Sequence, residues 1–163
     1  MNSIFVTVGS QSPFDRLVAV VDKWASTRPD IHTYAQIGQG RYEPKNMPFS
    51  RSITQQEFES RLAGCDLVVS HAGMGTIISA LVLSKPILAL PRHASLGETR
   101  NDHQLATAEK FAERGMLVHA SDEDELIALL ERSRDWPAGP ALGSTASHRL
   151  LGAITDFVNE SPS

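Results

Sequence analysis

The chain has 163 residues, of which 41% are hydrophobic and 21% are charged, and its formal net charge is −4. These values are typical of one soluble globular domain with a sizeable core, so we expect residues 1–163 to form a single domain. Acidic side chains outnumber basic ones and basic residues do not cluster, which argues against binding of nucleic acid.

Cysteine use and hydropathy indicate the compartment. Cys65 is the single cysteine, which excludes an internal disulfide and fits a reducing compartment. It precedes a buried strand, so a core thiol is favoured over a nucleophile. The N-terminal segment lacks the features of a signal peptide, and no apolar run approaches the length of a membrane span. We therefore expect a cytoplasmic protein.

Strands and helices are predicted to alternate from the N-terminus onward. The β-branched and apolar run Ile4–Val8 indicates a strand. Ser12 is expected to cap a helix that begins at Pro13, because apolar residues then recur at helical spacing. Further strands are predicted over Thr33–Ile37 and, more briefly, over Phe49–Ile53.

The central part of the chain is predicted to form a helix and then a strand–glycine loop–helix–strand unit. Thr54–Glu57 matches a capping box at a helix start. Leu67–Val69 is a short apolar run of the kind that forms a strand buried on both faces. The loop Ala72–Thr76 has two glycines where the next helix begins, and Ile87–Leu90 is predicted to form the following strand.

The remaining elements follow the same alternation. Asn101 or Asp102 is expected to cap a helix that ends at Gly115. Met116–Val118 is predicted as a last short strand, and Ser121 as the cap of a helix with an acidic first turn.

A connector and a terminal helix are predicted at the C-terminal end. Prolines, glycines and small residues over 136–147 indicate a flexible connector, and apolar spacing over 148–159 indicates a helix. That helix is expected to pack on the chain's own sheet or, alternatively, on a partner's domain. The alternation as a whole predicts an α/β fold with a mostly parallel sheet.

Two glycine loops each follow a strand and precede a helix, at Gly9–Gln11 and at Gly73–Thr76. In an open parallel sheet such loops can face one crevice, and the N–H groups of a helix N-terminus suit a phosphate. Many such glycines bind nothing, so a purely structural role stays open. The second loop matches neither the dinucleotide fingerprint nor a Walker loop.

The chain resembles the C-terminal, donor-binding domain of glycosyltransferase family 28. The resemblance rests on His71–Thr76, Lys85–Pro86 and Asn101–Gln104. Val6–Ser10 is similar to the start of the small subunit of the eukaryotic enzyme that adds the second N-acetylglucosamine to dolichol. Arg92–Glu98 resembles most closely the small subunits of two-subunit exopolysaccharide glycosyltransferases. The resemblance implies a Rossmann-like sheet with helices on both faces, the C-terminal half of a GT-B glycosyltransferase.

The resemblance also implies roles for individual residues around a UDP-sugar. The residues expected around the donor diphosphate are Gly9, Ser10, Gln11, His71, Gly73, Met74, Gly75 and Thr76. Those expected at the uracil and ribose are Ile53 and Ser79, and those expected at the sugar are Asp102 and Gln104. No metal or other cofactor is expected, since helix N-termini can hold a diphosphate without one.

Several of these residues have an alternative interpretation. Asp102 could be a simple helix cap and Gln104 a solvated side chain. His71 is either a cation that faces phosphate or sugar, which we favour, or a strand-end histidine bonded to backbone. Ser79 stands where the family usually has a glutamate that binds the ribose. Losing charged hydrogen bonds there should cost about 1.5–3 kcal/mol of donor affinity.

The resemblance implies the donor-binding subunit of a heteromeric, inverting UDP-sugar glycosyltransferase. Its expected partner is a membrane-anchored subunit that binds a lipid-linked saccharide acceptor, supplies the general base and recruits this chain to the cytoplasmic face of the membrane. No catalytic residue is evident in the chain itself. Two alternatives remain: a non-catalytic scaffold for a membrane-bound partner, and a self-sufficient α/β enzyme that acts as a homodimer.

Overall fold

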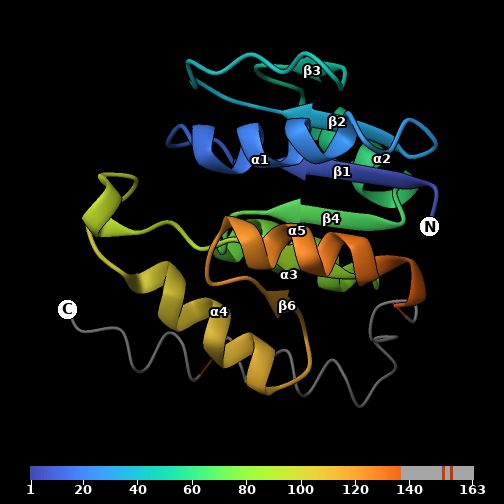
Figure 1. Ribbon diagram of the computed structural model, residues 1–163. Helices are drawn as coiled ribbons and strands as arrows, with labels where there is room; N and C mark the ends of the chain where they lie inside the picture. The colour runs from blue at the N-terminus through green and yellow to red at the C-terminus, as the bar shows by residue number, and fades with distance from the viewer. Residues whose placement is uncertain (137–151, 153–154, 156–163) are drawn as a thin grey trace.

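A parallel sheet runs through the centre of the molecule, with its strands in the order β3-β2-β1-β4-β5-β6 (Figure 1). The computed structural model describes residues 1–136, 152 and 155, so the predicted connector and terminal helix lie almost wholly outside the described residues. The strands are β1 (Ser3–Thr7), β2 (His32–Gln36), β3 (Phe49–Ser50), β4 (Leu67–Ser70), β5 (Ile87–Ala89) and β6 (Val118–His119). All the pairings are parallel, which confirms the predicted α/β class.

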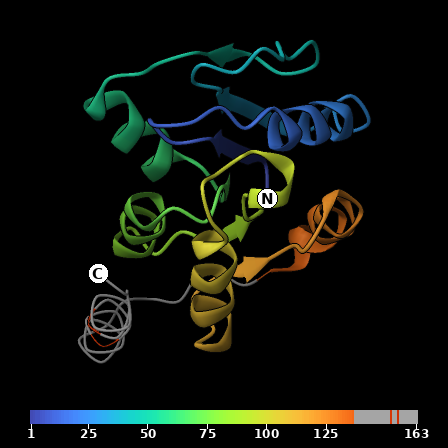
Figure 2. The same ribbon diagram turned by 90° about the vertical axis from the view of Figure 1, so that its left-hand side faces the viewer.

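Helices cover both faces of this sheet (Figure 2). They are α1 (Asp15–Ala25), α2 (Gln55–Gly64), α3 (Met74–Val82), α4 (His103–Glu113) and α5 (Glu123–Arg132). One apolar cluster joins α1 and α5 to the sheet, and a second joins α2, α3 and α4 to the opposite face. No helix in the described part of the chain is long and apolar enough to cross a membrane.

Side chains of β1 alternate between these two clusters, as the period of a strand requires. Ile4 and Val6 pack on the α1 face, whereas Phe5 packs on the α3 face, and all three are at most 2% exposed. A strand covered on both faces must be apolar at every position, which is why the sequence shows a continuous apolar run here instead of polar alternation.

The strand order reverses between β1 and β4, which lie side by side with Val6 opposite Val69. The chain leaves β1 toward β2 on one side and leaves β4 toward β5 on the other. The loops after β1 and β4 therefore diverge and leave a crevice at the carboxyl ends of the strands. Figure 2 looks onto this edge of the sheet. The prediction that the two glycine loops face one crevice is confirmed, because residues of both loops line the same cavity.

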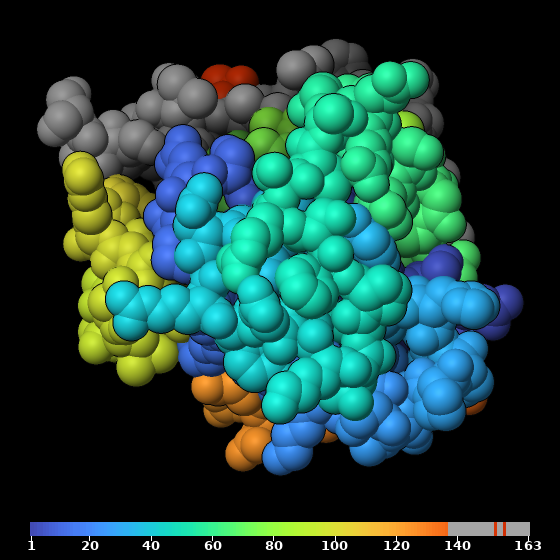
Figure 3. All heavy atoms as spheres, turned by 90° about the horizontal axis from the view of Figure 1, so that it is seen from above, coloured from blue at the N-terminus to red at the C-terminus, as the bar shows by residue number. Residues whose placement is uncertain are grey.

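Strand and helix ends depart from the predictions where tertiary contacts intervene. β3 ends at Ser50, short of the predicted Ile53, although the N–H of Gly38, where φ is 60°, still donates to the Arg51 carbonyl at 2.9 Å. The segment that joins β2 to α2 contains β3, and it covers the side of the molecule that faces the viewer in Figure 3. β6 comprises Val118–His119, whereas Met116 and Leu117 are buried against the α3 face ahead of it.

Helix caps were predicted correctly only in part. Thr54 caps α2 by accepting a hydrogen bond from the N–H of Glu57 at 3.1 Å, as predicted. Ser12 does not cap α1, which begins at Asp15. Asp122, and not Ser121, caps α5, because the Ser121 side chain donates to Glu125 instead.

A buried carboxylate on α1 holds the proline-containing loop over 41–48. Asp22 is 1% exposed and accepts hydrogen bonds from the Tyr42 hydroxyl at 2.8 Å and from the N–H groups of Lys45 at 3.1 Å and Asn46 at 2.7 Å. Burial by itself raises the pKa of Asp22, but these hydrogen bonds outweigh it and the pKa is lowered. The loop is thus fixed by one charged acceptor.

Replacing this carboxylate should cost far more stability than replacing an exposed one. We expect Asp22→Ala to lower the free energy of unfolding by about 2–3 kcal/mol, because buried N–H groups lose a charged acceptor. The matched control is Asp30→Ala, whose ion pair with Arg134 is exposed and should be worth less than about 1 kcal/mol. Urea denaturation measures both, and equal losses would contradict the assigned role of Asp22.

Candidate functional site

Two adjoining cavities lie at the carboxyl edge of the sheet. The loop cavity, of about 360 Å³, lies between the two glycine loops. The side cavity, of about 430 Å³, extends toward β2 and the start of α2. Both are lined by Gly9, Ser10, Gly75 and Thr76, so they form one continuous depression. All eight residues predicted to surround a diphosphate line the loop cavity.

The N-terminus of α3 opens into both cavities. Gly73 occupies its cap position and has no side chain to bond the first turn. The first helical hydrogen bond runs from the N–H of Ile77 to the Gly73 carbonyl, at 3.1 Å, so the N–H groups of Met74–Thr76 have no acceptor within the helix. These donors and the positive end of the helix dipole make this end of the loop cavity suited to an anion.

The first glycine loop is held by a polar chain from β1 to β2. The Thr7 hydroxyl donates to Gln36 Oε1 at 2.7 Å, and Gln36 Nε2 donates to the Gly9 carbonyl at 3.2 Å. The Gly9 N–H donates to Thr7 Oγ1 and is therefore occupied, contrary to the expectation that it binds phosphate. Within the described residues, the N–H groups of Ser10 and Gln11 have no such acceptor.

The ring of His71 lies between the two glycine loops. A Cβ atom on Gly9, where φ is +76°, would lie 2.5 Å from His71 Nε2. A Cβ atom on Gly73 would lie 2.0 Å from His71 Cε1. Both distances are far inside contact range, so neither loop could carry a side chain with the ring in this place. The two glycines therefore allow the His71 ring to lie close to both loops.

His71 is neutral at physiological pH, which corrects the expected cation. Burial, and next the charge of Arg92, lower the pKa of this ring to about 4. Arg92 Nη1 lies 3.1 Å from His71 Nδ1, and Gln104 Nε2 lies 3.4 Å from the same atom. His71 Nε2 is buried without a hydrogen-bond partner among the described residues.

Arg92 is a site residue that sequence analysis missed. It is only 4% exposed, and its Nη2 donates to the carbonyls of Val8 at 2.8 Å and Ser12 at 2.5 Å. Its guanidinium lies 4.9 Å from the centre of the Phe14 ring. An arginine in a polar loop is normally exposed. Only its place in the segment Arg92–Glu98, which resembles the family, could have identified it as a site residue.

The side cavity contains Ile53 and Ser79, as the resemblance implied. Ser79 Oγ donates to the Gly75 carbonyl at 2.8 Å, so its proton is already used within α3. None of the described residues that line this cavity is acidic. No neighbouring carboxylate thus stands in for the glutamate that the family usually has at this position.

Asp102 and Gln104 differ in position. Gln104 lines the loop cavity, and its Oε1 accepts a hydrogen bond from the N–H of Arg92 at 3.2 Å, so it is not simply solvated. Asp102 does not line either cavity. Its side chain accepts from the Ala94 N–H at 2.9 Å and does not cap α4. The sugar contacts of both residues stay predictions.

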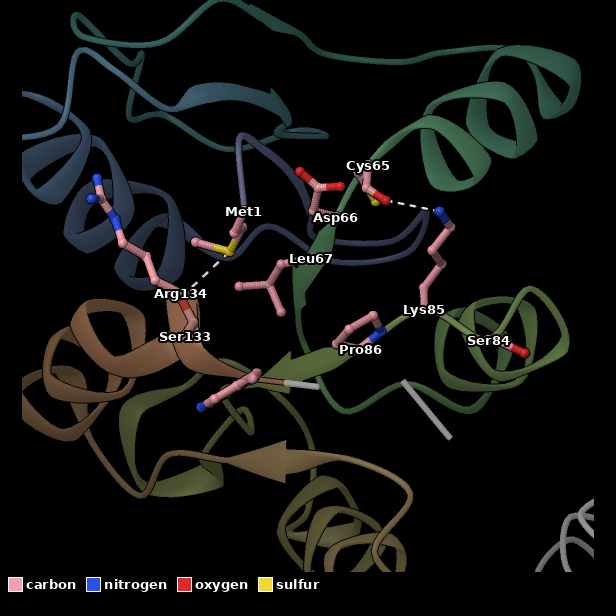
Figure 4. A pocket seen from close by; sticks show the side chains of 10 residues that line it. Met1, Cys65, Asp66, Leu67, Ser84, Lys85, Pro86, Ser133 and Arg134 are labelled. Carbon is pink, nitrogen blue, oxygen red and sulfur yellow. Dashed lines mark hydrogen bonds between the residues drawn. The ribbon is translucent and has the colours of Figure 1, made fainter. Parts of the chain in front are cut away.

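The opposite edge of the sheet has a separate cavity of about 280 Å³, shown in Figure 4. Met1, Cys65 and Lys85 line it, and Lys85 Nζ donates to the Cys65 carbonyl at 2.9 Å. Burial raises the pKa of the Cys65 thiol to about 11, so this group is a core thiol and not a nucleophile. Among the described residues, no cluster of side chains has the composition of a metal site.

Comparison with known proteins identifies a family and relatives that match most of the chain. The profile of the glycosyltransferase family 28 C-terminal domain matches residues 3–150. The UDP-N-acetylglucosamine transferase subunit ALG13 of Mus musculus is 31% identical over 133 residues, which cover 74% of this chain and 11% of that protein. This chain therefore spans only a small part of that relative.

Shorter relatives match over most of their length. ALG13 of Yarrowia lipolytica is 26% identical over 152 residues, which cover 82% of this chain and 73% of that protein. The NMR solution structure of ALG13 superposes with a TM-score of 0.64 at 23% identity, covering 92% of this chain and 94% of that one. At this identity the structural match concerns the fold, and it agrees with the Rossmann-like, GT-B-type sheet implied by the sequence.

Burial of neutral His71 should make the protein less stable as pH falls. The unfolded chain takes up a proton on this residue below about pH 6.5, whereas the folded protein does so only near pH 4, so the free energy of unfolding falls across that window. We expect the free energy of unfolding to fall by up to about 3 kcal/mol between pH 7 and pH 4. In His71→Gln this contribution should be missing.

Urea denaturation at a series of pH values measures this slope, and exposed His32, as His32→Gln, is the matched control. Asp22 and Asp66 lose their stabilising contribution only at lower pH, because the pKa of each is below its ordinary value of 3.8. An unchanged slope in His71→Gln would show that the pKa of this half-buried histidine is not lowered in the folded protein.

Proposed function

This chain belongs to the family of glycosyltransferase family 28 C-terminal domains, and on that premise we propose that it is the donor-binding subunit of a two-subunit UDP-sugar glycosyltransferase. The observation that carries the proposal is the convergence of the loops after β1 and β4 on one cavity. The free N–H groups of Ser10, Gln11 and the first turn of α3 line that cavity. Such donors can hold a diphosphate without a metal ion.

The rest of the donor would extend from the diphosphate in two directions. The nucleoside would occupy the side cavity, where Ile53 and Ser79 lie, and the sugar would lie toward Gln104 in the loop cavity. The choice of a uridine nucleotide is supported by the relatives, which are named UDP-N-acetylglucosamine transferase subunits. In an inverting transfer, the acceptor hydroxyl would displace UDP in one step after losing its proton to a base.

The general base for that step is expected on a partner subunit. Glu98 is the single carboxylate that lines the loop cavity among the described residues. It is bound by Arg16 at 2.7 Å and by the N–H of His93 at 2.9 Å, so this carboxylate is committed to a structural role. His71, with a pKa of about 4, is too weak a base at neutral pH.

We propose that the partner is a membrane-anchored subunit that binds a lipid-linked saccharide acceptor in polysaccharide synthesis. It would bring this chain to the cytoplasmic face of the membrane. The description of the relatives as subunits supports a second chain, and the resemblance of Arg92–Glu98 to exopolysaccharide enzymes supports the pathway.

A non-catalytic scaffold is the second candidate. The observation that favours it is the side cavity, where Ser79 donates to backbone and no acidic residue is present among the described lining residues. A chain that has lost the ribose contact could retain the fold and stabilise its partner without binding a nucleotide.

Nucleotide binding separates these two candidates. We expect affinity to rise from uridine to UMP to UDP, and to persist in EDTA, because the phosphates bind backbone N–H groups and a helix N-terminus. Isothermal titration calorimetry on the full chain measures each ligand. Equal affinities, or strict dependence on magnesium, would contradict the assignment of the loop cavity, and no binding at all would favour the scaffold.

Dependence on a partner forms the second test. The purified chain should show no sugar transfer with a panel of UDP-sugars and a lipid extract, since neither Glu98 nor His71 can act as the base. Transfer should appear when a membrane-anchored acceptor-binding subunit is co-expressed. Robust turnover by the single chain would instead support a self-sufficient enzyme.

A further inference from the structure

We propose that Arg92 is a positioning residue that fixes the ring of His71 as a hydrogen-bond donor into the loop cavity. The identity of the recipient, the donor diphosphate, rests on the function proposed above. The tautomer of the His71 ring does not depend on that function, and it can be measured without any ligand.

The first step is the contact at Nδ1. Arg92 Nη1 lies 3.1 Å from His71 Nδ1. A guanidinium has only N–H donors and keeps its charge, so Nδ1 must accept this hydrogen bond. A neutral imidazole that accepts at Nδ1 carries its proton on Nε2.

Gln104 supports the same assignment independently. Its Oε1 accepts from the N–H of Arg92 at 3.2 Å, and a backbone N–H can only donate, so the orientation of the amide is fixed. That orientation places Nε2, the donor side of the amide, 3.4 Å from His71 Nδ1. Both neighbours of Nδ1 are therefore donors, and neither leaves room for a proton there.

The second step concerns the opposite side of the ring. His71 lines the loop cavity, but its Nε2 atom is buried against Gly9 and has no partner among the described residues. A buried N–H without an acceptor is costly, so a ligand oxygen that reaches this atom when the Gly9 loop gives way would relieve that cost. Near free N–H groups of both glycine loops, His71 Nε2 would add one side-chain donor to an array of backbone donors.

The third step is how Arg92 is itself held. Its Nη2 is bound to the carbonyls of Val8 and Ser12, which fixes it to the loop after β1. The Arg92 guanidinium thus connects three loops: the loop after β1, the loop after β4 that carries His71, and the loop after β5 that carries Arg92 itself.

The charge of Arg92 also opposes protonation of the ring. Burial and this neighbouring cation together lower the pKa of His71 to about 4. Of the elements packed against the ring, the loop after β5 contributes Arg92, α4 contributes neutral Gln104, and the loop after β1 contributes Gly9. Glu98 interacts with Arg92 and is paired with Arg16. The ring should therefore stay a neutral donor across the physiological range.

The ring tautomer can be measured directly by nitrogen-15 NMR of the full chain, with the signals of His71 among the six histidines assigned through His71→Gln. We expect the proton on Nε2 and a bare Nδ1 in the absence of any ligand. A proton on Nδ1, or a ring that exchanges between both forms, would overturn the proposal. If the proton is on Nε2 but UDP does not bind, the proposed function fails while the positioning by Arg92 stands.

Arg92→Met tests the cause, with Arg16→Met as the matched control. Both arginines pack on the ring of Phe14, but only Arg92 contacts His71. In Arg92→Met the ring proton should no longer be fixed on Nε2, and His71 should titrate at a higher pH. UDP binding should weaken by about tenfold at pH 7.5. The ratio of its UDP affinity to that of the wild type should vary with pH, a comparison that cancels the titration of UDP itself.

Arg16→Met should change neither the tautomer nor the titration of His71. Arg92→Lys keeps a cationic donor and should restore the Nε2 proton, at least in part, and it also serves if Arg92→Met fails to fold. The proposal is overturned if an Arg92 variant that folds without a donor retains the tautomer and the pH dependence of the wild type.

Discussion

Strands β1 and β4 lie next to each other at the point where the strand order reverses, and the arrangement of the site depends on this pairing. Because both strands end at the same edge, the loops that follow them meet there. The His71 ring then fits between these loops only because Gly9 and Gly73 carry no side chain. Sheet order and two glycines together decide where the cavity lies and what lines it.

The loop cavity is suited to an anion although the arginine that lines it among the described residues, Arg92, is buried. What faces the cavity is the N-terminus of α3, with its unpaired N–H groups and the positive end of its dipole. Fixed dipoles of this kind need little reorganisation when a charged ligand arrives, and they do not lose their charge with pH. This explains how a chain with a net charge of −4 can offer a phosphate-type site.

Two polar side chains that line the cavities are committed to contacts within the protein. Glu98 is committed to Arg16, and the proton of Ser79 is committed to Gly75. Glu98 and Ser79 therefore hold a loop and a helix in place, which makes them unsuited to proton transfer. A binding half that relies on a second chain for chemistry is consistent with these commitments.

The sequence by itself determined the α/β class, most strand positions, the cap at Thr54 and the two glycine loops, because these follow from local periodicity, turn chemistry and capping. The resemblance to the family also identified many of the residues that line the loop cavity, although not Arg92. Only the tertiary structure decided that Arg92 is buried, that Ser12 does not cap α1 and that His71 is neutral. Burial and pKa are set by neighbours far away in the chain, and Arg92 reaches Val8, Ser12 and His71 only after β1, β4 and β5 have paired.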